Sequence, residues 1–177
     1  MKFNKKKCLE LLKKRNDLQK NGKLFRNYDK VKHDELISYL TLIEDKIFCK
    51  SAKGYFQILD SFINKTITID QFLNQFYSIR GSNLKLARTL KKKLEEEALG
   101  VFPQSTEINI EIDPKSYGIT KLISSLHSLV ELYDPDVTLE MNLKQPELVL
   151  YGISEEFIRF KVKKDFLPEL KKYCKKS

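Results

Sequence analysis

Cysteine and histidine are the side chains that most often carry nucleophilic catalysis or bind a metal, and this chain contains few of them. Its three cysteines, Cys8, Cys49 and Cys174, are widely spaced and form no Cys-x-x-Cys pair. Its two histidines, His33 and His127, belong to no metal-ligand signature. We therefore expect ordinary buried or surface thiols and imidazoles, with no metal site and no cofactor.

Paired acids are the other group that could do chemistry. Asp134 and Asp136 could bind a cation, but Pro135 between them and the lack of further ordered oxygen ligands favour a turn. The sequence contains no glycine-rich phosphate loop, no Gly-x-Ser-x-Gly elbow and no His-Glu-x-x-His pair. Because nucleophile, base and metal-ligand signatures are all missing, we predict that the chain is not an enzyme and acts by binding.

The formal net charge of +9 is concentrated at the N-terminus. Residues 1–33 contain twelve Lys and Arg and three acids, whereas the rest of the chain contains 21 residues of each sign. The stretch 101–160 is acidic, with ten Asp and Glu against four Lys and Arg, and 161–177 is basic again. The charge therefore divides the chain into a basic arm, a near-neutral centre, an acidic stretch and a basic tail.

Two interpretations of the basic arm stay open. A Lys-rich helix can follow a phosphate backbone or an anionic membrane. The candidate nucleic-acid contacts are Lys5, Lys6, Lys7, Lys13, Lys14 and Arg15. The arm can also be a solvated face whose charge keeps the protein soluble, which is the interpretation we favour. Because Arg is scarce, any nucleic-acid contact is expected to be nonspecific and salt-dependent.

Length and composition indicate a folded intracellular protein. At 177 residues, 41% of them hydrophobic, the chain can bury one core of ordinary size. No apolar run is long enough to span a membrane, and the N-terminus lacks the apolar core and cleavage site of a signal peptide. We expect a cytoplasmic protein, or one of the plastid stroma if it is organelle-encoded. The excess of Lys over Arg, with abundant Ile, Asn and Phe, is typical of an AT-rich genome.

A helical hairpin over residues 54–77 is the clearest predicted element. Apolar residues recur there at three- and four-residue spacing: Tyr55, Phe56, Leu59, Phe62, Ile63, Ile69, Phe72, Leu73 and Phe76. Thr68 and Gln71 form a Thr-x-x-Gln capping box, and Ile67 and Phe72 occupy the positions of a hydrophobic staple. These signals predict two helices that pack through their apolar faces.

Helical spacing is found in several other segments. It predicts helices over residues 3–20, 34–49, 82–98, 119–133 and 154–173. The second hairpin helix is expected to end near Gly81, with Ser82 capping the next helix and Ser154 capping the last. Pro168 predicts a kink or a break near Phe166 or Leu167.

A small β element completes the predicted fold. Alternating apolar residues predict strands near 106–112 and 137–143, and a short apolar run predicts another near 147–151. The fold class is therefore mainly α, a helical bundle with a small β element. We expect a basic N-terminal helical arm over 1–33 and a helical-bundle domain, with this β insertion, over 34–177.

The hairpin carries a resemblance to a known family. An aromatic-x-x-Leu-x-x-Phe pattern, then Asn-Lys-x-Ile-Thr and two phenylalanines, comprises Phe56, Leu59, Phe62, Asn64, Lys65, Ile67, Thr68, Phe72 and Phe76. This pattern resembles the bacterial self-protective, colicin-like immunity proteins, best over residues 53–80. Downstream, ISSLHSLVELYDPD and ISEEFIRFKVKKDFLPELKKY look loosely like that family's later two helices, to residue 173.

The resemblance implies a non-catalytic helical bundle that inhibits a basic nuclease toxin by presenting acids to its active site. The counterparts of those acids in this chain are Glu131, Asp134, Asp136, Glu140, Glu155 and Glu156. Such carboxylates can occupy the positions of phosphates and steer a basic partner, or they can simply solvate a turn and a helix start. The alternative function is an accessory protein of a ribonucleoprotein or other large complex, anchored by the Lys-rich arm and tail.

Overall fold

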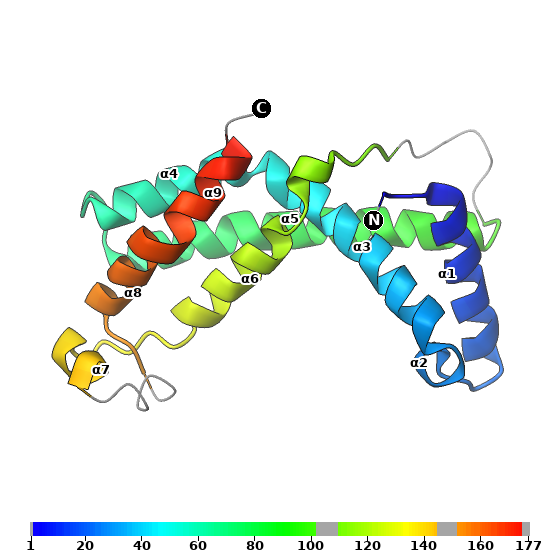
Figure 1. Ribbon diagram of the computed structural model, residues 1–177, viewed down its shortest axis with the longest axis horizontal. Helices are drawn as coiled ribbons and strands as arrows, with labels where there is room; N and C mark the ends of the chain where they lie inside the picture. Colours follow the sequence, from blue (N-terminus) through cyan, green and yellow to red (C-terminus); the bar gives the residue numbers. More distant parts are fainter. Residues whose placement is uncertain (1, 102–109, 145–151, 175–177) are drawn as a thin grey trace. The chain divides into compact units, whose positions relative to one another are not determined.

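The computed structural model describes residues 2–101, 110–144 and 152–174. This part of the chain is mainly helical, as the sequence predicts, and the chain divides into two compact units. Unit 1 consists of Met1–Ile47 and Asn83–Tyr117, and unit 2 of Phe48–Ser82 and Gly118–Ser177. Two long helices, α3 (Lys30–Lys50) and α5 (Ile69–Ala98), contribute residues to both units (Figure 1).

Unit 1 is built around α1 (Lys5–Lys20), α2 (Phe25–Tyr28), the first part of α3 and the last part of α5, with a short 3₁₀ turn, η1 (Pro114–Ser116). Asn4 caps α1 by accepting a hydrogen bond from the backbone N–H of Lys7 at 3.0 Å. The core includes Cys8, Leu11, Leu12, Phe25, Leu36, Ile43 and Leu94. Residues 2–33, which the sequence sets apart as an arm, thus share a core with α3 and α5.

Unit 2 contains the predicted helical hairpin, formed by α4 (Ala52–Ile63) and the first part of α5. Both capping-box bonds are present: the Gln71 backbone N–H donates to Thr68 Oγ1 at 3.2 Å, and the Thr68 N–H donates to Gln71 Oε1 at 3.0 Å. The rings of Phe62 and Phe72 stack across the hairpin with centroids 4.4 Å apart. The predicted hairpin, its cap and its apolar contact are confirmed.

Further helical segments complete unit 2. They are α6 (Ile119–Val130), α7 (Leu139–Lys144), α8 (Glu155–Lys161), the π-helical segment η3 (Val162–Phe166) and α9 (Leu167–Cys174). Helix α9 contacts α4 and α6, and α7 contacts α8. Ser154 caps α8 as predicted, accepting a hydrogen bond from the Phe157 N–H at 3.1 Å. The irregularity expected before Pro168 takes the form of η3.

The predicted end of a helix at Gly81 is wrong. Helix α5 continues through Gly81 and Ser82 without a break. A glycine inside a helix costs only about 1 kcal/mol relative to alanine. The apolar residues on both sides of Gly81, including the fully buried Phe76 and Leu94, anchor the two parts of α5 in separate cores. Tertiary packing therefore outweighs the local helix-ending signal.

The predicted small β element is not found in the described residues. The strand predicted at 137–143 is wrong, because Leu139–Lys144 form α7, with Thr138 Oγ1 accepting from the Met141 N–H at 3.3 Å. Residues 110–112 form no strand, and 106–109 and 147–151 lie outside the described residues. One isolated parallel bridge joins Tyr133 and Ile153. Across the described ranges, no helix has both the length and the apolar composition to cross a membrane.

Candidate partner-binding surface

The loop after α6 is fastened to the segment before α8. The Ile153 N–H donates to the Leu132 carbonyl at 2.7 Å, and the Asp134 N–H donates to the Ile153 carbonyl at 3.0 Å. These two bonds form the bridge between Tyr133 and Ile153. As a result, the acids of the loop and those in the first turn of α8 belong to one surface, although they are far apart in the sequence.

Asn142 attaches α7 to the same segment. Its side-chain N–H donates to the Gly152 carbonyl at 3.1 Å, and its Oδ1 accepts from the Ser154 N–H at 2.9 Å. Asn142 is only 3% exposed, so water does not compete for these bonds. Leaving either backbone group unpaired would cost about 1–3 kcal/mol. The side chain therefore fixes α7 and the start of α8 to each other.

Gly152 allows the loop to approach this segment closely. A Cβ atom at position 152 would lie 2.9 Å from the Asp134 Cβ and 3.1 Å from Val137 Cγ2. Both distances are shorter than ordinary van der Waals contact between carbon atoms. The position of the Asp134 backbone therefore depends on the absence of a side chain at Gly152.

Four carboxylates act electrostatically on Tyr133. Burial raises the pKa of Tyr133, and the negative charges of Glu155, Asp70, Glu156 and Asp134 raise it further. These acids come from the first turn of α5, the loop after α6 and the first turn of α8. In the described ranges, no three Asp, Glu, His or Cys side chains form a group that could hold a metal ion.

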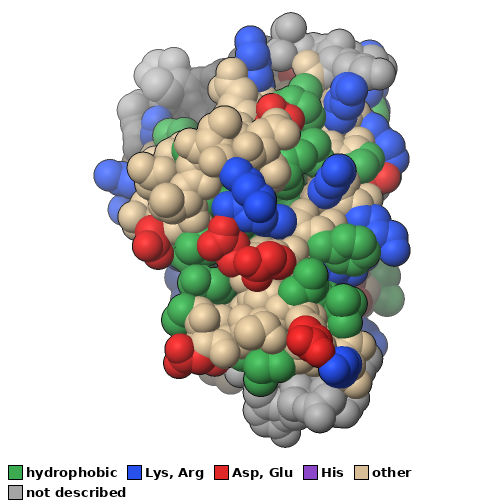
Figure 2. Space-filling model, turned by 90° about the vertical axis from the view of Figure 1, so that its left-hand side faces the viewer, with side chains coloured by type: hydrophobic (Ala, Val, Ile, Leu, Met, Phe, Trp, Pro, Cys, Tyr) green, Lys and Arg blue, Asp and Glu red, His purple; other side chains and the backbone are tan. Residues whose placement is uncertain are grey.

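Asp136 extends this set, because its backbone N–H donates to Asp134 Oδ1 at 2.9 Å and its side chain is exposed. We call the whole set the acidic surface: Asp70, Tyr133, Asp134, Asp136, Glu155 and Glu156. On the face of the molecule in Figure 2, acidic side chains (red) gather near the middle, with Lys and Arg side chains (blue) directly above them. Asp136 and Glu156, both exposed, offer carboxylates for recognition.

Three of the six acids predicted as partner contacts are already paired within the protein. The pairs are Glu131 with His127, Glu140 with Lys144, and Glu155 with Arg159. Glu140 lies on α7 and is not among the acids that act on Tyr133. Glu131 ends α6, where its carboxylate lies 3.1 Å from His127 Nδ1. Neither Glu131 nor Glu140 is therefore part of the acidic surface.

The remaining predicted acids, Asp134, Asp136 and Glu156, form no ion pair with any Lys or Arg in the part of the chain that the structure describes. The same is true of Asp70, which sequence reasoning missed. Its place in the first turn of α5, next to the Thr68 cap, is fully explained by the favourable helix dipole. Nothing in the sequence indicated its proximity to Tyr133.

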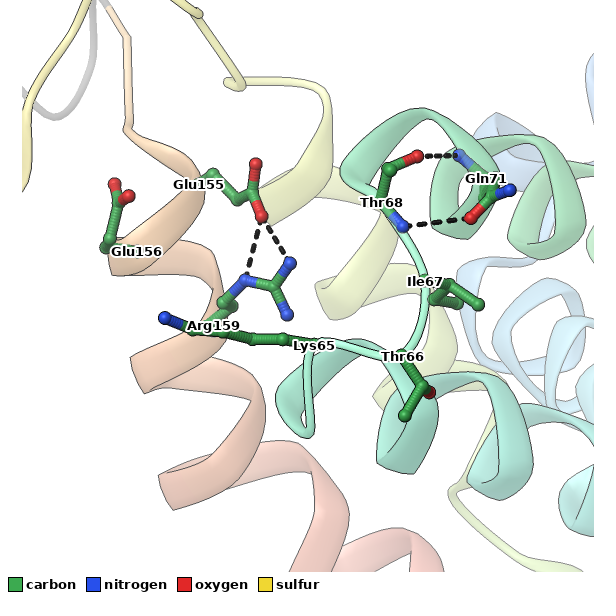
Figure 3. Close-up of a pocket in the computed structure, with 8 residues that line it drawn as sticks. All are labelled: Lys65, Thr66, Ile67, Thr68, Gln71, Glu155, Glu156 and Arg159. Atoms are coloured by element: carbon green, nitrogen blue, oxygen red, sulfur yellow. Dashed lines mark hydrogen bonds and ion pairs between the residues drawn. The ribbon is translucent and has the colours of Figure 1, made fainter.

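A polar pocket of about 320 Å³ lies beside the paired Glu155. It is lined by Lys65, Thr66, Ile67, Thr68, Gln71, Glu155, Glu156 and Arg159 (Figure 3). The Arg159 guanidinium stacks on Phe62 at 3.9 Å from the ring centroid, and its Nε donates to Glu155 at 2.8 Å. Glu156 points away from this pair. The lining contains no nucleophile with an adjacent base, so the pocket suits recognition of a polar group.

The cysteines suggest no second site. No disulfide involves Cys8, Cys49 or Cys174 in the described part of the chain. Burial raises the pKa of Cys8 to about 11, and burial also raises the pKa of Cys174. Both thiols are therefore poor nucleophiles at neutral pH.

The basic residues of the alternative nucleic-acid site are largely engaged inside unit 1. Four of the six form ion pairs: Lys5 with Glu97, Lys7 with Glu35, Lys14 with Asp29, and Arg15 with Glu95. The Arg15 and Lys5 contacts, at 2.9 and 2.8 Å, join α1 to α5. Lys6 and Lys13 are exposed, without an ion pair to any described acid. Most of this basic set therefore stabilises the packing of α1.

No protein-family model, no curated protein and no solved structure matches this chain. The role of the acidic surface is therefore inferred from its geometry and its charge.

Proposed function

We propose that this chain is a non-catalytic binding protein that inhibits a basic nuclease toxin through the acidic surface. The observation that carries the proposal is a set of carboxylates that lack an internal counter-ion among the described residues. The charges of Asp70, Asp134 and Glu156 act on Tyr133, and Asp136 is hydrogen-bonded through its backbone to Asp134. Asp70 and Glu156 gain some stability from the dipoles of α5 and α8, but like charges placed near one another repel. A cationic partner would relieve that repulsion.

The contacts that fix the segments carrying these acids support the same proposal. The backbone bonds between the loop and Ile153, and the Asn142 contacts, hold the backbone of the loop and of the segment before α8 in place before a partner arrives. A preorganised surface loses little conformational entropy on binding, which favours tight association. Tyr133 adds an amphipathic ring among the charges, and tyrosine is one of the side chains that most often dominate binding energy at interfaces.

The resemblance of residues 53–80 to immunity proteins supports the choice of a nuclease as the partner. A nuclease binds phosphates in a basic active site, and carboxylates can take the positions of those phosphates. Complementary charge would also speed association, with a strong dependence on ionic strength. Inhibition by carboxylates in place of phosphates and fast, salt-dependent association both follow from the surface charge. Neither requires a catalytic residue in this chain.

The test is affinity capture from extracts of the native cell, followed by a nuclease assay. The wild-type chain is expected to retain a basic protein that degrades DNA or RNA once separated from it, and added wild-type chain is expected to restore inhibition. The double variant Asp136→Lys/Glu156→Lys should weaken this inhibition on the order of a hundredfold, because two attractive charge pairs become repulsive. Neither side chain takes part in the internal bonds of the acidic surface.

Glu169→Lys is the matched control, because Glu169 is an exposed acid on α9 of the same unit. It should inhibit like the wild type. Equal inhibition by the double variant, or capture of no nuclease by the wild-type chain, would refute the proposal.

A further inference from the structure

The connection between α1 and α3, together with the first turn of α3, exposes three large apolar side chains. Leu24 is 65% exposed, Tyr28 61% and Val31 79%. They are held in a defined position, because Phe25 between them is buried and its ring meets His33 edge-on at a centroid distance of 5.9 Å. Exposed apolar residues scattered singly need no explanation, whereas three within one short segment that is also rich in Lys and Arg can contribute to an interaction site.

Basic side chains accompany this apolar turn. Lys20, Lys23, Arg26, Lys30 and Lys32 are all exposed. Asp29, the one acid in the sequence from 20 to 32, accepts hydrogen bonds from Lys14 Nζ at 2.9 Å and from the Lys32 N–H at 3.1 Å. These bonds lower the pKa of Asp29, so its charge is retained and compensated. We call residues 20–32 the basic turn.

Helix α1 does not cancel the positive charge of the basic turn. A shallow hollow beside Tyr28 is lined by two acids, Glu10 and Asp17, and by two bases, Lys13 and Lys14. These four charges balance one another. The positive charge of the basic turn, which lies around α2 in Figure 1, is therefore left for a partner.

The exposed side chains distinguish between two anionic partners. Single-stranded nucleic acid is bound by aromatic rings on which bases stack, and Leu24 and Val31 cannot serve in that way. The Tyr28 ring is already in contact with ammonium groups: Lys14 Nζ lies 5.6 Å and Lys23 Nζ 5.8 Å from its centroid. Aliphatic side chains next to lysines instead match the boundary between lipid headgroups and acyl chains, where lysines reach the phosphates.

We propose that the basic turn docks this protein on membranes that contain anionic phospholipids. Leu24, Tyr28 and Val31 enter the headgroup region, and the surrounding Lys and Arg side chains bind the lipid phosphates and carboxylates. This is peripheral binding by unit 1, and it does not depend on the proposed function of the acidic surface in unit 2.

The experiment is co-sedimentation of the full chain with phosphatidylcholine vesicles, with and without phosphatidylserine. The wild type should bind only the vesicles with phosphatidylserine. Arg26→Glu/Lys30→Glu should lower that binding by at least about tenfold, because each cation near an anionic bilayer strengthens binding roughly fivefold. Leu24→Ser/Val31→Ser should lower it several-fold at unchanged ionic strength. Leu86→Ser, at a 58% exposed position of α5 in unit 1, is the matched control and should bind like the wild type.

Far-ultraviolet circular dichroism of each variant checks folding, and Val31→Ser alone provides a second apolar variant at the most exposed position. A single-stranded RNA oligonucleotide is tested in parallel by fluorescence anisotropy. Absence of vesicle binding by the wild type would overturn the proposal. Vesicle binding that is insensitive to both apolar variants would also overturn it. So would RNA binding that displaces the vesicles and is lost only in Arg26→Glu/Lys30→Glu, because the basic turn would then be a nucleic-acid site.

Discussion

Helix α1 in unit 1 and the acidic surface in unit 2 are both strongly charged, but their charges have different surroundings. On α1, Lys5, Lys14 and Arg15 each lie within 3 Å of a carboxylate of the same unit. On the acidic surface, Asp136 and Glu156 have no Lys or Arg partner among the described residues. Charge used to hold helices together and charge presented to a partner look alike in a sequence. The pairing found in the folded chain separates them.

The largest expected effect comes from disturbing the backbone that presents the acids. Gly152→Ala places a methyl group against Asp134 and Val137, so the loop must move away from the segment before α8. We expect a loss of about 1–3 kcal/mol in the free energy of unfolding. Urea unfolding measures it. Gly81→Ala is the matched control, since nothing lies within 4 Å of its added methyl group. This control should stabilise α5 by about 0.5–1 kcal/mol, and equal values for the two variants would contradict the close approach at Gly152.

Removing the two Asn142 side-chain hydrogen bonds should lower the free energy of unfolding slightly less than Gly152→Ala does. Asn142→Ala leaves the Gly152 carbonyl and the Ser154 N–H without their partner, and we expect a loss of about 1–3 kcal/mol, towards the lower end if water enters. Asn142→Asp keeps an acceptor for the Ser154 N–H and should lose less. Thermal unfolding with hydrogen exchange at Ser154 tests both variants. Unchanged hydrogen-exchange protection of the Ser154 N–H in Asn142→Ala would show that the Asn142 side chain is not needed to hold the segment before α8.

Neutralising the paired charges of α1 should lower the free energy of unfolding, whereas neutralising the unpaired acids should leave it unchanged or raise it. A double-mutant cycle of Arg15→Gln and Glu95→Gln should give a coupling of about 0.2–1 kcal/mol, reduced by salt because the pair is partly exposed. Asp136→Asn/Glu156→Gln should leave stability unchanged, or raise it by up to about 0.5 kcal/mol, because repulsion is relieved. Urea unfolding at low and high salt compares the two. A marked loss of stability in Asp136→Asn/Glu156→Gln would mean that these acids are structural.

The smallest expected effect concerns the pKa of Tyr133. Asp70→Asn/Glu156→Gln removes two of the negative charges that raise it, so the pKa should fall towards that of an ordinary tyrosine. A pKa raised in the folded state gives stability that is fully present below the unfolded pKa and is lost as pH rises through the folded value. The variant should therefore lose stability less steeply in alkali. Carbon-13 NMR of labelled tyrosine measures the shift, and Glu169→Gln should not change it.

Local signals were sufficient to predict the hairpin. The capping box of Thr68 and Gln71 and the stacked Phe62 and Phe72 involve residues close in sequence, whose spacing fixes a helix start and an apolar face. The Ser154 cap was predictable for the same reason. Such features are decided within one or two helical turns, so a single sequence contains the needed information.

Features decided by distant contacts were not predictable. The alternation of apolar residues over 137–143 suggested a strand, yet the residue buried on α7 is Asn142, while Met141 and Leu143 are exposed. Its burial depends on two backbone groups ten or more residues away. The same limit hid Asp70, because α5 and the loop after α6, which carries Tyr133, belong to one unit only in the folded chain. The predicted acids of the loop and of α8, together with the missed Asp70, are the charges that act on Tyr133, and their role as partner contacts stays a prediction.

The π-helical segment η3 determines which sequence changes this part of the protein can tolerate during evolution. The buried residues Ile158, Val162, Phe166 and Leu170 recur every four positions. In a regular α-helix such a repeat drifts around the axis by about 40° per step, since 3.6 residues complete a turn. The wider turns of η3 absorb part of that drift. Lys163 and Lys164, both exposed, can thus mutate freely, but deleting either one would rotate Phe166 and Leu170 out of register with Ile158. Natural selection should therefore conserve the length of η3 more strongly than the identity of its exposed residues.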